Sequence, residues 1–393
     1  MVLTILARGR SLGIASPDGS LWRSGSGTDH NAPVTTWSGR NEPGRLAPNN
    51  VQDESIVKTF ADLFCGGGLG ARGAVNAGLQ PLVAVDLWDI ACQTYSHNFP
   101  SATVLNRRIE EIDPLQYARP GGVDLLLASP ECTNHSVAKG AAVRDEGSRE
   151  TALHTIKWIA ALRPRWFVME NVKEMRAWPR YRELHNTLSA LGYQVREEVI
   201  NAAQFGAPQA RVRLFLIGGL NMLPPAITPL PCTPVRTVRD ILDPDGTWPE
   251  QPLFVAGRAA NTVVRARNAI RTLGRDAEFL LVYYGSGGER SWQTLDQPLR
   301  TVTTIDRFAL VRKRRGRYMI RMLQPSELAR AMSLPDAHAF PVGTRREKVK
   351  LCGNGICATV IETIVEHLKA VELAESDAIQ RQAECQDRIA LPA

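Results

Sequence analysis

Short apolar runs alternate with longer amphipathic segments from Ile56 to about residue 220. Apolar runs of about four to eight residues are typical of buried strands, and apolar positions three or four residues apart are typical of helices. The pattern predicts strands at 57–64, 82–86, 123–128, 166–170, 194–200 and 213–218. It predicts helices at 69–77, 90–99, 149–162 and 181–191. Strands separated by helices indicate an α/β fold with a doubly wound, mostly parallel sheet.

Outside this region the regular alternation of predicted strands and helices does not continue. Residues 221–310 are punctuated by Pro and Gly and predict a smaller module that is irregular and partly β, whereas 356–370 predict a long final helix. Residues 1–55 are rich in Gly, Ser, Pro and Asn, which favours a disordered segment or arm, although a start codon assigned too early accounts for them equally well. We expect five parts: 1–55, a first domain at 56–220, the smaller module at 221–310, a segment at 311–375 that contains the final helix, and a tail at 376–393.

Composition narrows the class of protein. With 393 residues, 44% of them hydrophobic, the chain can form one large domain and a smaller one. No stretch reaches the roughly 18 apolar residues of a membrane span, and no signal peptide is evident. The seven cysteines are scattered without a Cys-x-x-Cys pair. This favours a reducing cytoplasm and argues against a disulfide scaffold or a metal site.

Positive charge is concentrated in two places. The net charge is +7, and residues 257–275 carry five arginines with no acid among them. Residues 312–317, Arg-Lys-Arg-Arg-Gly-Arg, form a second basic cluster. A solvated helix face explains either cluster alone, but two clusters together favour phosphate contacts with a nucleic acid.

Three residues whose side chains can take part in catalysis lie near predicted strand ends. Cys132 follows the strand at 123–128, Glu170 ends the strand at 166–170, and Arg211 leads into the strand at 213–218. A thiol nucleophile, a carboxyl that can act as an acid and a forked cation together predict a nucleophilic site with electrophile activation. For Cys132 alone, a buried structural role is the competing interpretation.

A glycine loop predicts a nucleotide-like cofactor. Phe64, Gly66 and Gly68 lie between a predicted strand and a helix, where glycines let backbone amides approach a ligand. Asp86 ends the next strand and can bind ribose hydroxyls, and Trp88 can stack on adenine. Alone, this arrangement suits a dinucleotide equally well.

Five signatures in a fixed order make the pattern specific. They are the loop at 62–70, the segment 129–138 around Cys132, Glu170-Asn171-Val172, the Gln-x-Arg-x-Arg motif at 209–213 and Gly-Asn-Gly at 353–355. In this order, over roughly residues 57–370, the chain resembles the cytosine-C5 DNA methyltransferases of prokaryotes and phages. The resemblance implies a Rossmann-like methyltransferase domain that binds S-adenosyl-L-methionine at 56–220 and a target-recognition domain at 221–310. In the family the final helix packs back on the catalytic domain, so the resemblance also implies that 221–310 is an insertion and that 311–375 returns to the first domain.

The resemblance also implies a mechanism. Cys132 would attack C6 of a cytosine flipped out of duplex DNA, and the methyl group would go to C5. Glu170 would hold or protonate N3, Arg211 would bind O2, and Asn171 would brace the loop. The implied cofactor residues are Asp62, Phe64, Gly66, Gly68, Asp86, Trp88, Pro130 and Asn354. The expected DNA-binding residues are Ser136, Gln209, Arg213, Arg258, Arg265 and Arg267.

Two positions depart from the family pattern. The usual Pro-Cys-Gln is Glu131-Cys132-Thr133, and the acid expected after the third strand is replaced by Arg108. An acid there would contact the adenine amine, so Arg108 puts that contact in doubt. Glu131 either points away from the thiol or carries the thiol's proton.

Other functions fit less well. Methylation of an exocyclic amine needs Pro-Pro followed by an aromatic residue, where this chain has Pro130-Glu131-Cys132. RNA cytosine-C5 methylation, a catalytically inactive DNA-binding relative and a nicotinamide oxidoreductase remain alternatives. The expected partner is double-stranded DNA, and we expect the protein to be a monomer that does not bind a membrane. A separately encoded restriction endonuclease is a further candidate partner.

Overall fold

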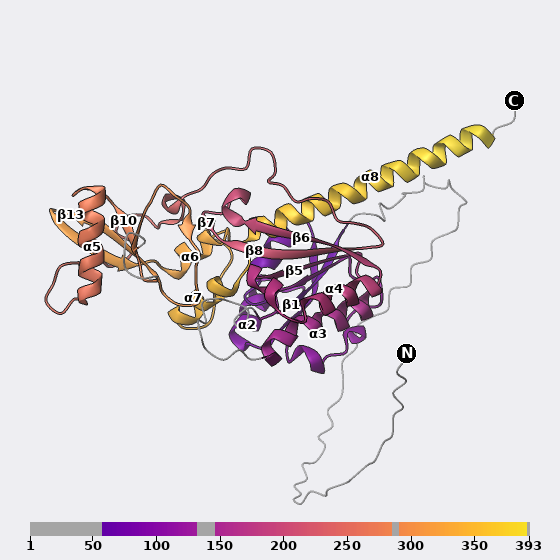
Figure 1. Ribbon diagram of the computed structural model, residues 1–393, viewed down its shortest axis with the longest axis horizontal. Coiled ribbons are helices and arrows are strands. Elements are labelled where there is room, and N and C mark those ends of the chain that lie inside the picture. The colour runs from indigo at the N-terminus through magenta and orange to yellow at the C-terminus, as the bar shows by residue number, and fades with distance from the viewer. Residues whose placement is uncertain (1–56, 132–145, 285–290, 391–393) are drawn as a thin grey trace, which may run out of the picture. The chain divides into compact units, whose positions relative to one another are not determined.

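The computed structural model describes residues 57–131, 146–284 and 291–390, with side chains left out at 146–150 and 383–390 (Figure 1). The segment expected at 1–55 lies outside the described residues. Cys132 and Ser136 also lie outside them.

Within the described residues, seven strands form the larger sheet, in the order β3-β2-β1-β4-β5-β8-β6. The strands are β1 Thr59–Leu63, β2 Gln80–Asp86, β3 Thr103–Asn106, β4 Leu125–Ala128, β5 Trp166–Asn171, β6 Tyr193–Asn201 and β8 Val212–Leu220. Pairing is parallel from β3 through β5, whereas β8 runs antiparallel to both β5 and β6. The prediction of a doubly wound, mostly parallel sheet is confirmed.

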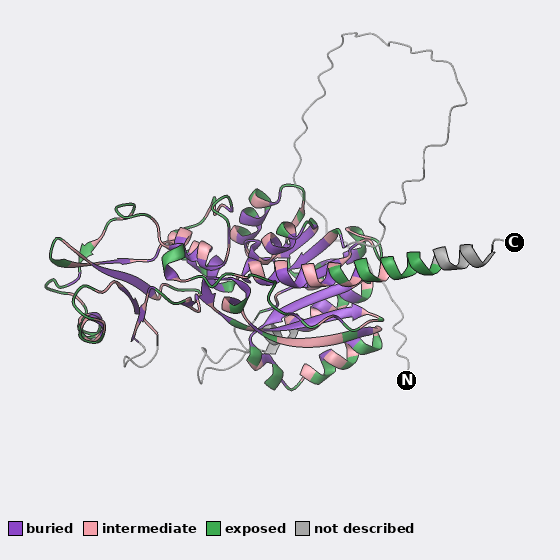
Figure 2. Cartoon of the chain, turned by 90° about the horizontal axis from the view of Figure 1, so that it is seen from above, coloured by how far each residue is buried: buried purple, intermediate pink, exposed green. Residues whose placement is uncertain are grey.

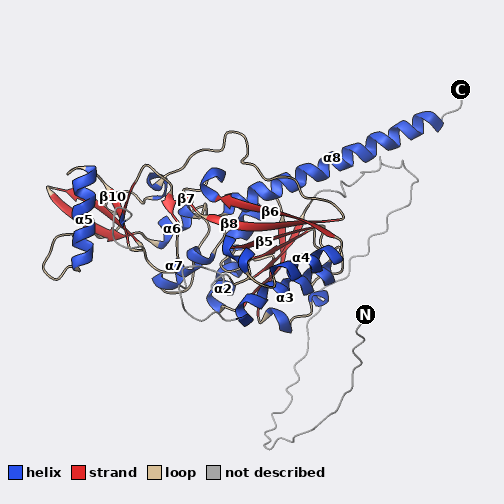
Figure 3. Ribbon diagram, in the orientation of Figure 1, coloured by secondary structure: helices blue, strands red, loops and turns tan. Residues whose placement is uncertain are grey.

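Helices cover both faces of this sheet (Figure 3). They are α1 Leu69–Asn76, α2 Asp89–Asn98, α3 Glu146–Leu162, α4 Tyr181–Ala190 and α8 Ala358–Ala390. Successive strand residues point to opposite faces, so Leu125 packs in the core beneath α1 and α8 while Leu126 packs in the core beneath α3 and α4. Burial on both sides explains why the central strands are continuously apolar in sequence.

The final helix, α8, packs against α1, the first helix of the first domain. α8 lies against α1, and a Cβ placed on Gly73 of α1 would lie 2.1 Å from the Ala358 carbonyl oxygen, so only glycine allows this approach. Glu372 of α8 accepts a 2.6 Å hydrogen bond from Trp166 Nε1 on β5. The helix has 33 residues, and its outer half is largely exposed where it is described (Figure 2). It therefore extends well beyond the predicted end at residue 370.

A second sheet forms the small domain. In the described part of the chain it has five strands, in the order β11-β10-β13-β14-β9. These are β9 Gln251–Pro252, β10 Phe279–Val282, β11 Trp292–Thr294, β13 Phe308–Arg314 and β14 Arg317–Met322. The prediction of a partly β insertion is confirmed, but the predicted boundary at residue 310 is wrong because it falls inside β13.

The small domain also contains a helix that the sequence pattern did not predict, α5 Ala260–Leu273. Its Ala266 and Ala269 pack with Leu253, Phe279 and Leu281 in a separate apolar core. The connecting elements are α6 Pro325–Ala331, α7 Arg345–Asn354, β7 Gln209–Ala210, β12 Leu299–Arg300 and the 3-10 helices Ile109–Glu111, Pro114–Gln116, Lys173–Ala177, Ala202–Phe205 and Val238–Ile241. Among all the helices described, none combines the length and apolar character needed to cross a membrane.

A buried ion pair joins β14 to α6. Arg321 donates two hydrogen bonds to Glu327, at 2.8 and 2.6 Å, and Glu327 is fully buried. Glu327 also accepts from the backbone amides of Gln324 and Asp243. The Glu327 carboxylate thus fixes the start of α6, the end of β14 and the backbone at Asp243.

Replacing Glu327 with Gln should therefore lower the free energy of unfolding by about 3 kcal/mol, because Arg321 loses its buried counter-charge. Chemical denaturation followed by circular dichroism measures this loss. The control is Asp336→Asn, which removes an exposed partner of Arg330 and should cost less than about 1 kcal/mol. Equal costs for the two substitutions would contradict the prediction.

Candidate functional site

The predicted site residues gather where parallel strands end. Phe64 follows β1, Asp86 ends β2, Pro130 follows β4, and Glu170 lies near the end of β5. Because β1, β2, β4 and β5 are parallel, their carboxyl ends meet at one edge of the sheet. Ligands of open α/β sheets bind outside this edge.

The glycine loop after β1 is held by Asp86. The amide of Gly66 donates to one carboxylate oxygen of Asp86 and the amide of Trp88 donates to the other, both at 2.8 Å. A Cβ on Gly68 would lie 2.4 Å from the Phe99 ring, and Gly68 has a φ of +77°, so this position requires glycine. Above Gly66, by contrast, no atom lies within 4 Å of such a Cβ. The loop therefore offers an open stretch of backbone beside an acid.

Asp62 lies beneath this loop at the end of β1. It is buried, and burial raises its pKa well above the ordinary value, with the Asp86 carboxylate raising it further. Burial also raises the pKa of Asp86, against the effect of its amide donors. Both oxygens of Asp86 already accept backbone hydrogen bonds, but a carboxylate has about four acceptor positions, so one remains for a ligand hydroxyl. Among the described residues, no group of three or more His, Cys, Asp or Glu could hold a metal ion.

Trp88 is partly exposed and carries a cation on its face. Lys350 of α7 places its ammonium 4.2 Å from the centre of the Trp88 ring, a cation–π contact. Its charge lowers the pKa of Asp86, although burial outweighs it. Sequence reasoning missed Lys350, because more than 250 positions separate it from the residues that it meets.

Arg108, the departure after β3, is exposed and forms a 2.6 Å ion pair with Glu110. Its guanidinium is thus directed to an acid of its own segment. The chain provides no carboxylate at position 108 itself.

Glu170 and Arg213 form the central pair of the site. The antiparallel pairing of β5 with β8 sets Asn171 opposite Leu214, which brings Arg213 beside Glu170. Arg213 Nε lies 3.0 Å from Glu170 Oε1 without the alignment of a hydrogen bond, so this buried oxygen can still accept one. Burial raises the pKa of Glu170, and the two guanidinium groups of Arg213 and Arg211 oppose that rise. Glu170 therefore holds a proton more readily than an exposed carboxyl.

Arg211 and Gln209 bind the protein's own backbone. Arg211 is buried and donates to the carbonyl oxygens of Val302 and Gly353, at 3.0 and 2.9 Å. Gln209 is fully buried, donates to the Ala331 carbonyl and accepts from the Val302 amide. The roles expected of Arg211 at the base and of Gln209 on DNA stay predictions. Arg213, expected on DNA, is the arginine that reaches the acid.

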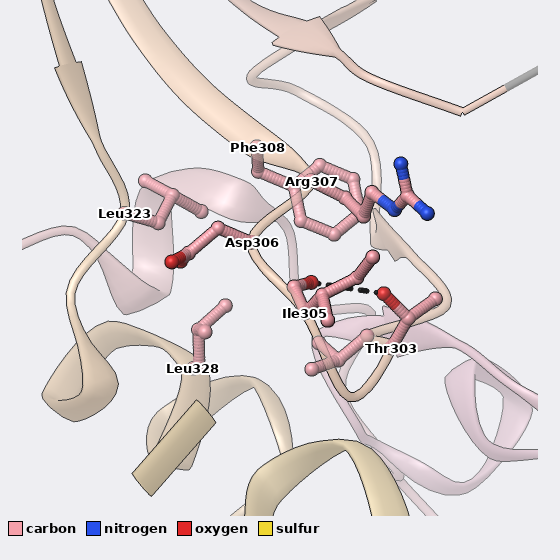
Figure 4. Close-up of a pocket in the computed structure, with 8 residues that line it drawn as sticks. Thr303, Ile305, Asp306, Arg307, Phe308, Leu323 and Leu328 are labelled. Atoms are coloured by element: carbon pink, nitrogen blue, oxygen red, sulfur yellow. Dashed lines mark hydrogen bonds between the residues drawn. The ribbon is translucent and has the colours of Figure 1, made fainter. Parts of the chain in front are cut away.

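The loop contacted by Arg211 continues toward β13. Figure 4 shows its residues Thr303 to Phe308, with the Thr303 hydroxyl donating to the Ile305 carbonyl at 3.0 Å. Asn354, at the end of α7, is exposed and follows the glycine whose carbonyl Arg211 holds. Asn354 is thus placed by the same bridge that fixes this loop.

Asn171 braces the segment that leads to Cys132. Its side-chain amide donates to the Pro130 carbonyl at 3.2 Å, and its oxygen accepts from the Val172 amide at 2.8 Å. On the other side, the Ser129 hydroxyl donates to the Phe64 carbonyl at 2.9 Å. The chain entering position 132 is therefore tied to both the glycine loop and β5.

Two of the three arginines expected on DNA bind the backbone of the small domain. Arg258 donates to the carbonyls of Pro252 and Leu253. Arg265 donates to the Val282 carbonyl and lies over the Tyr283 ring. Arg267 is the exposed one of the three. The DNA-binding role expected of all three stays a prediction.

His338 is a further residue that the sequence did not single out. Its Nε2 lies 3.0 Å from the Gly67 carbonyl, which fixes it as a donor, and its ring lies between Phe99 and Phe340. Burial lowers the pKa of His338 to about 4. A neutral histidine thus anchors the glycine loop from a segment 271 positions away.

Comparisons with known proteins agree with this arrangement. The sequence profile of the family described as C-5 cytosine-specific DNA methylase matches residues 58–370. The Type II methyltransferase M.NlaX of Neisseria lactamica is 28% identical over 80% of this chain and 97% of its own length. The Type II methyltransferase M1.HphI of Haemophilus parahaemolyticus is 31% identical over 41% of this chain. The chain spans about half the length of M1.HphI and of M.XorII from Xanthomonas oryzae, 45% and 47% respectively.

Solved structures share the fold. A Spodoptera frugiperda DNMT2 variant superposes with a TM-score of 0.59 at 19% identity, covering 79% of this chain and 99% of that one. The Entamoeba histolytica methyltransferase EhMeth superposes with a TM-score of 0.58 at 14% identity, covering 79% and 97%.

The depressed pKa of His338 predicts acid sensitivity. The unfolded chain takes up a proton on this residue below about pH 6.5, but the folded chain does so only near pH 4. Stability should therefore fall as pH decreases through this window, by about 2 kcal/mol between pH 7 and 5. His338→Gln keeps a donor for Gly67 and removes the titration.

Unfolding of both proteins at several pH values, measured by chemical denaturation, tests this prediction. The buried carboxyls contribute equally to both, so their effects cancel in the difference. A stability difference between the two proteins that stays constant from pH 7 to pH 5 would rule out the role of His338.

Proposed function

Since the chain belongs to the family of C-5 cytosine-specific DNA methylases, we propose that it transfers a methyl group from S-adenosyl-L-methionine to C5 of cytosine in double-stranded DNA. The observation that carries this proposal is the buried Glu170–Arg213 pair, next to the braced segment that leads to Cys132. A carboxyl with a raised pKa, an adjacent guanidinium and a thiol match the needs of addition to a pyrimidine ring.

The residues at the glycine loop fit the proposed cofactor. S-adenosyl-L-methionine, when bound, supplies a methyl group on a sulfonium sulfur. The open backbone at Gly66 would approach it, Asp86 would accept from ribose hydroxyls, and Trp88 would stack on adenine with Lys350 nearby. The remaining residues proposed to line this site are Asp62, Phe64, Gly68, Pro130 and Asn354. Arg108 would leave the adenine amine without the family's acidic partner.

We propose that Cys132 forms a covalent bond to C6 of the target cytosine. The thiolate supplies the electron pair, C5 then becomes nucleophilic and accepts the methyl group, and loss of the C5 proton expels the thiolate again. This role comes from the sequence motif, because Cys132 lies outside the described residues. Glu131 beside it remains either a bystander or a carrier of the thiol's proton.

Glu170 would hold a proton on N3 of the cytosine. Its raised pKa keeps the carboxyl protonated at higher pH than usual, and protonation at N3 draws electron density from C6. Arg213 would orient this carboxyl and is better placed than Arg211 to reach the base. Arg211 would not contact the base itself; it would hold the loop at Val302 and the end of α7 in place.

The target base must leave the helix to reach these groups, at a cost of roughly a few kcal/mol. Ser136 is a candidate for contact with the opened duplex, and the small domain is the proposed reader of sequence. A monomer provides all of these parts. A separate restriction endonuclease and a cytoplasmic location remain predictions from the family.

Transfer of tritium from methyl-labelled S-adenosyl-L-methionine tests the proposed function. The purified protein should label unmodified duplex DNA, and methylation-sensitive sequencing should locate the label at C5 of cytosine in one sequence context. Label in RNA but not in DNA would overturn the DNA assignment. Label on an exocyclic amine would overturn the chemistry.

A duplex with 5-fluorocytosine at the target position should trap the protein covalently, because fluorine cannot leave C5 as a proton does. Cys132→Ala should abolish trapping and turnover while DNA binding persists. Gel electrophoresis under denaturing conditions detects the adduct. Methylation by the alanine variant would refute the covalent mechanism.

Glu170→Gln should slow single-turnover methylation by about 10²- to 10⁴-fold, because an amide cannot transfer a proton. In the wild type, the rate should decline as pH rises past the elevated pKa of Glu170. The matched control is Glu198→Gln on β6, a partly exposed residue paired with Arg196 at 4.0 Å, which should leave the rate unchanged. An equal effect of both substitutions would contradict the assignment of Glu170.

A further inference from the structure

A hollow of about 610 Å³ lies in the small domain, between α5 and the β13–β14 hairpin. It is well away in sequence from the residues of the proposed active site. Four cationic and two aromatic side chains line it: Arg267, Arg271, Arg275, Lys313, Phe254 and Tyr318.

The cations of the hollow are poorly neutralised by the protein itself. Lys313 pairs with the exposed Asp276 at 2.8 Å, and Arg271 contacts only the neutral side chain of Asn268. The charge of Arg275 acts on the same carboxylate, Asp276, so these four cations share one acid. The hollow therefore keeps a net positive charge.

The spacing of these arginines points to a ligand. Arg267 and Arg271 are four residues apart on α5, so they share one helix face, and Arg275 follows the turn at Gly274. Like charges at this spacing repel and destabilise a helix. A polyanion that binds along this face would remove the repulsion.

The aromatic residues give the hollow an apolar wall and a fixed shape. Phe254 and Tyr318 meet edge to face, with ring centres 5.7 Å apart, and Phe254 remains 42% exposed. The Tyr318 hydroxyl donates to the Arg275 carbonyl at 2.8 Å, which ties the turn after α5 to the hairpin. Exposed Arg315 and Arg317 at the hairpin extend the positive surface.

We propose that this hollow binds the sugar–phosphate backbone of duplex DNA outside the target base pair. Guanidinium groups along its edge would bind phosphates, and the aromatic wall would contact the deoxyriboses. Arg258 and Arg265, by contrast, donate to the domain's own backbone, so these two arginines are structural and differ from those that line the hollow. The inference rests on the proposed action on DNA, and it names the part of the small domain that holds the duplex.

Binding of the full-length protein to a 30-base-pair duplex, followed by fluorescence anisotropy over a range of salt concentrations, tests the proposal. Each phosphate contact contributes about 0.9 to the slope of log K against log salt. Arg267→Gln/Arg271→Gln should reduce the slope by nearly two units and weaken binding to every sequence alike. The control Arg182→Gln, an exposed arginine of α4, should leave the slope unchanged.

The possible outcomes are distinct. An unchanged slope in the double variant, with unfolding like that of the wild type, would overturn the proposal. Competition by inorganic pyrophosphate, lost in the variant while DNA binding is unaffected, would assign the hollow to a small anion and would also overturn it. A reduced slope for duplex RNA alone would do the same. The slope does not depend on methyl transfer, so a protein that binds DNA in this way without methylating it would contradict only the proposed function.

Discussion

The buried bridge made by Gln209 and Arg211 is the constraint on which the site depends. Gln209 belongs to β7 and Arg211 lies between β7 and β8. Their side chains bind the backbone of Val302, Ala331 and Gly353. Each partner belongs to a segment far away in sequence, and each would otherwise hold an unsatisfied polar group. The bridge therefore fixes the large sheet, the loop before β13 and the end of α7 in one arrangement. Arg213 lies two residues after Arg211, so the bridge also fixes the position of Arg213.

This division of labour explains how neighbouring arginines acquire different chemistry. The guanidinium of Arg211 donates to two backbone carbonyl oxygens, which do not titrate. Arg213 faces the Glu170 carboxyl. Burial raises the pKa of Glu170, whereas the positive charge of Arg213 lowers it. A small change in solvation at Glu170 would thus alter its proton affinity strongly. Such sensitivity is typical of groups that exchange protons with a substrate.

The sequence was informative where the controlling interactions are local. The apolar runs predicted the central strands because β4 and β5 are buried on both faces, and the five ordered signatures placed Glu170 and Asn171 at a strand end. The pattern failed for α5, whose buried positions are Thr262, Ala266 and Ala269, small residues set among arginines. It could not separate Arg211 from Arg213 within one motif, and it missed His338 and Lys350. Those three outcomes depend on contacts between distant segments, which no local pattern encodes.

The packing of α8 on α1 has a consequence for how the protein is made. The sheet face that these helices share is completed by residues from Ala358 onward, which are synthesised well after the strands that they cover. Until then the nascent chain carries Leu125, Val168 and their neighbours without this cover. Folding of this face must therefore wait for α8, and contacts that distant in sequence form slowly. A chain that stopped before α8 would leave this apolar face uncovered.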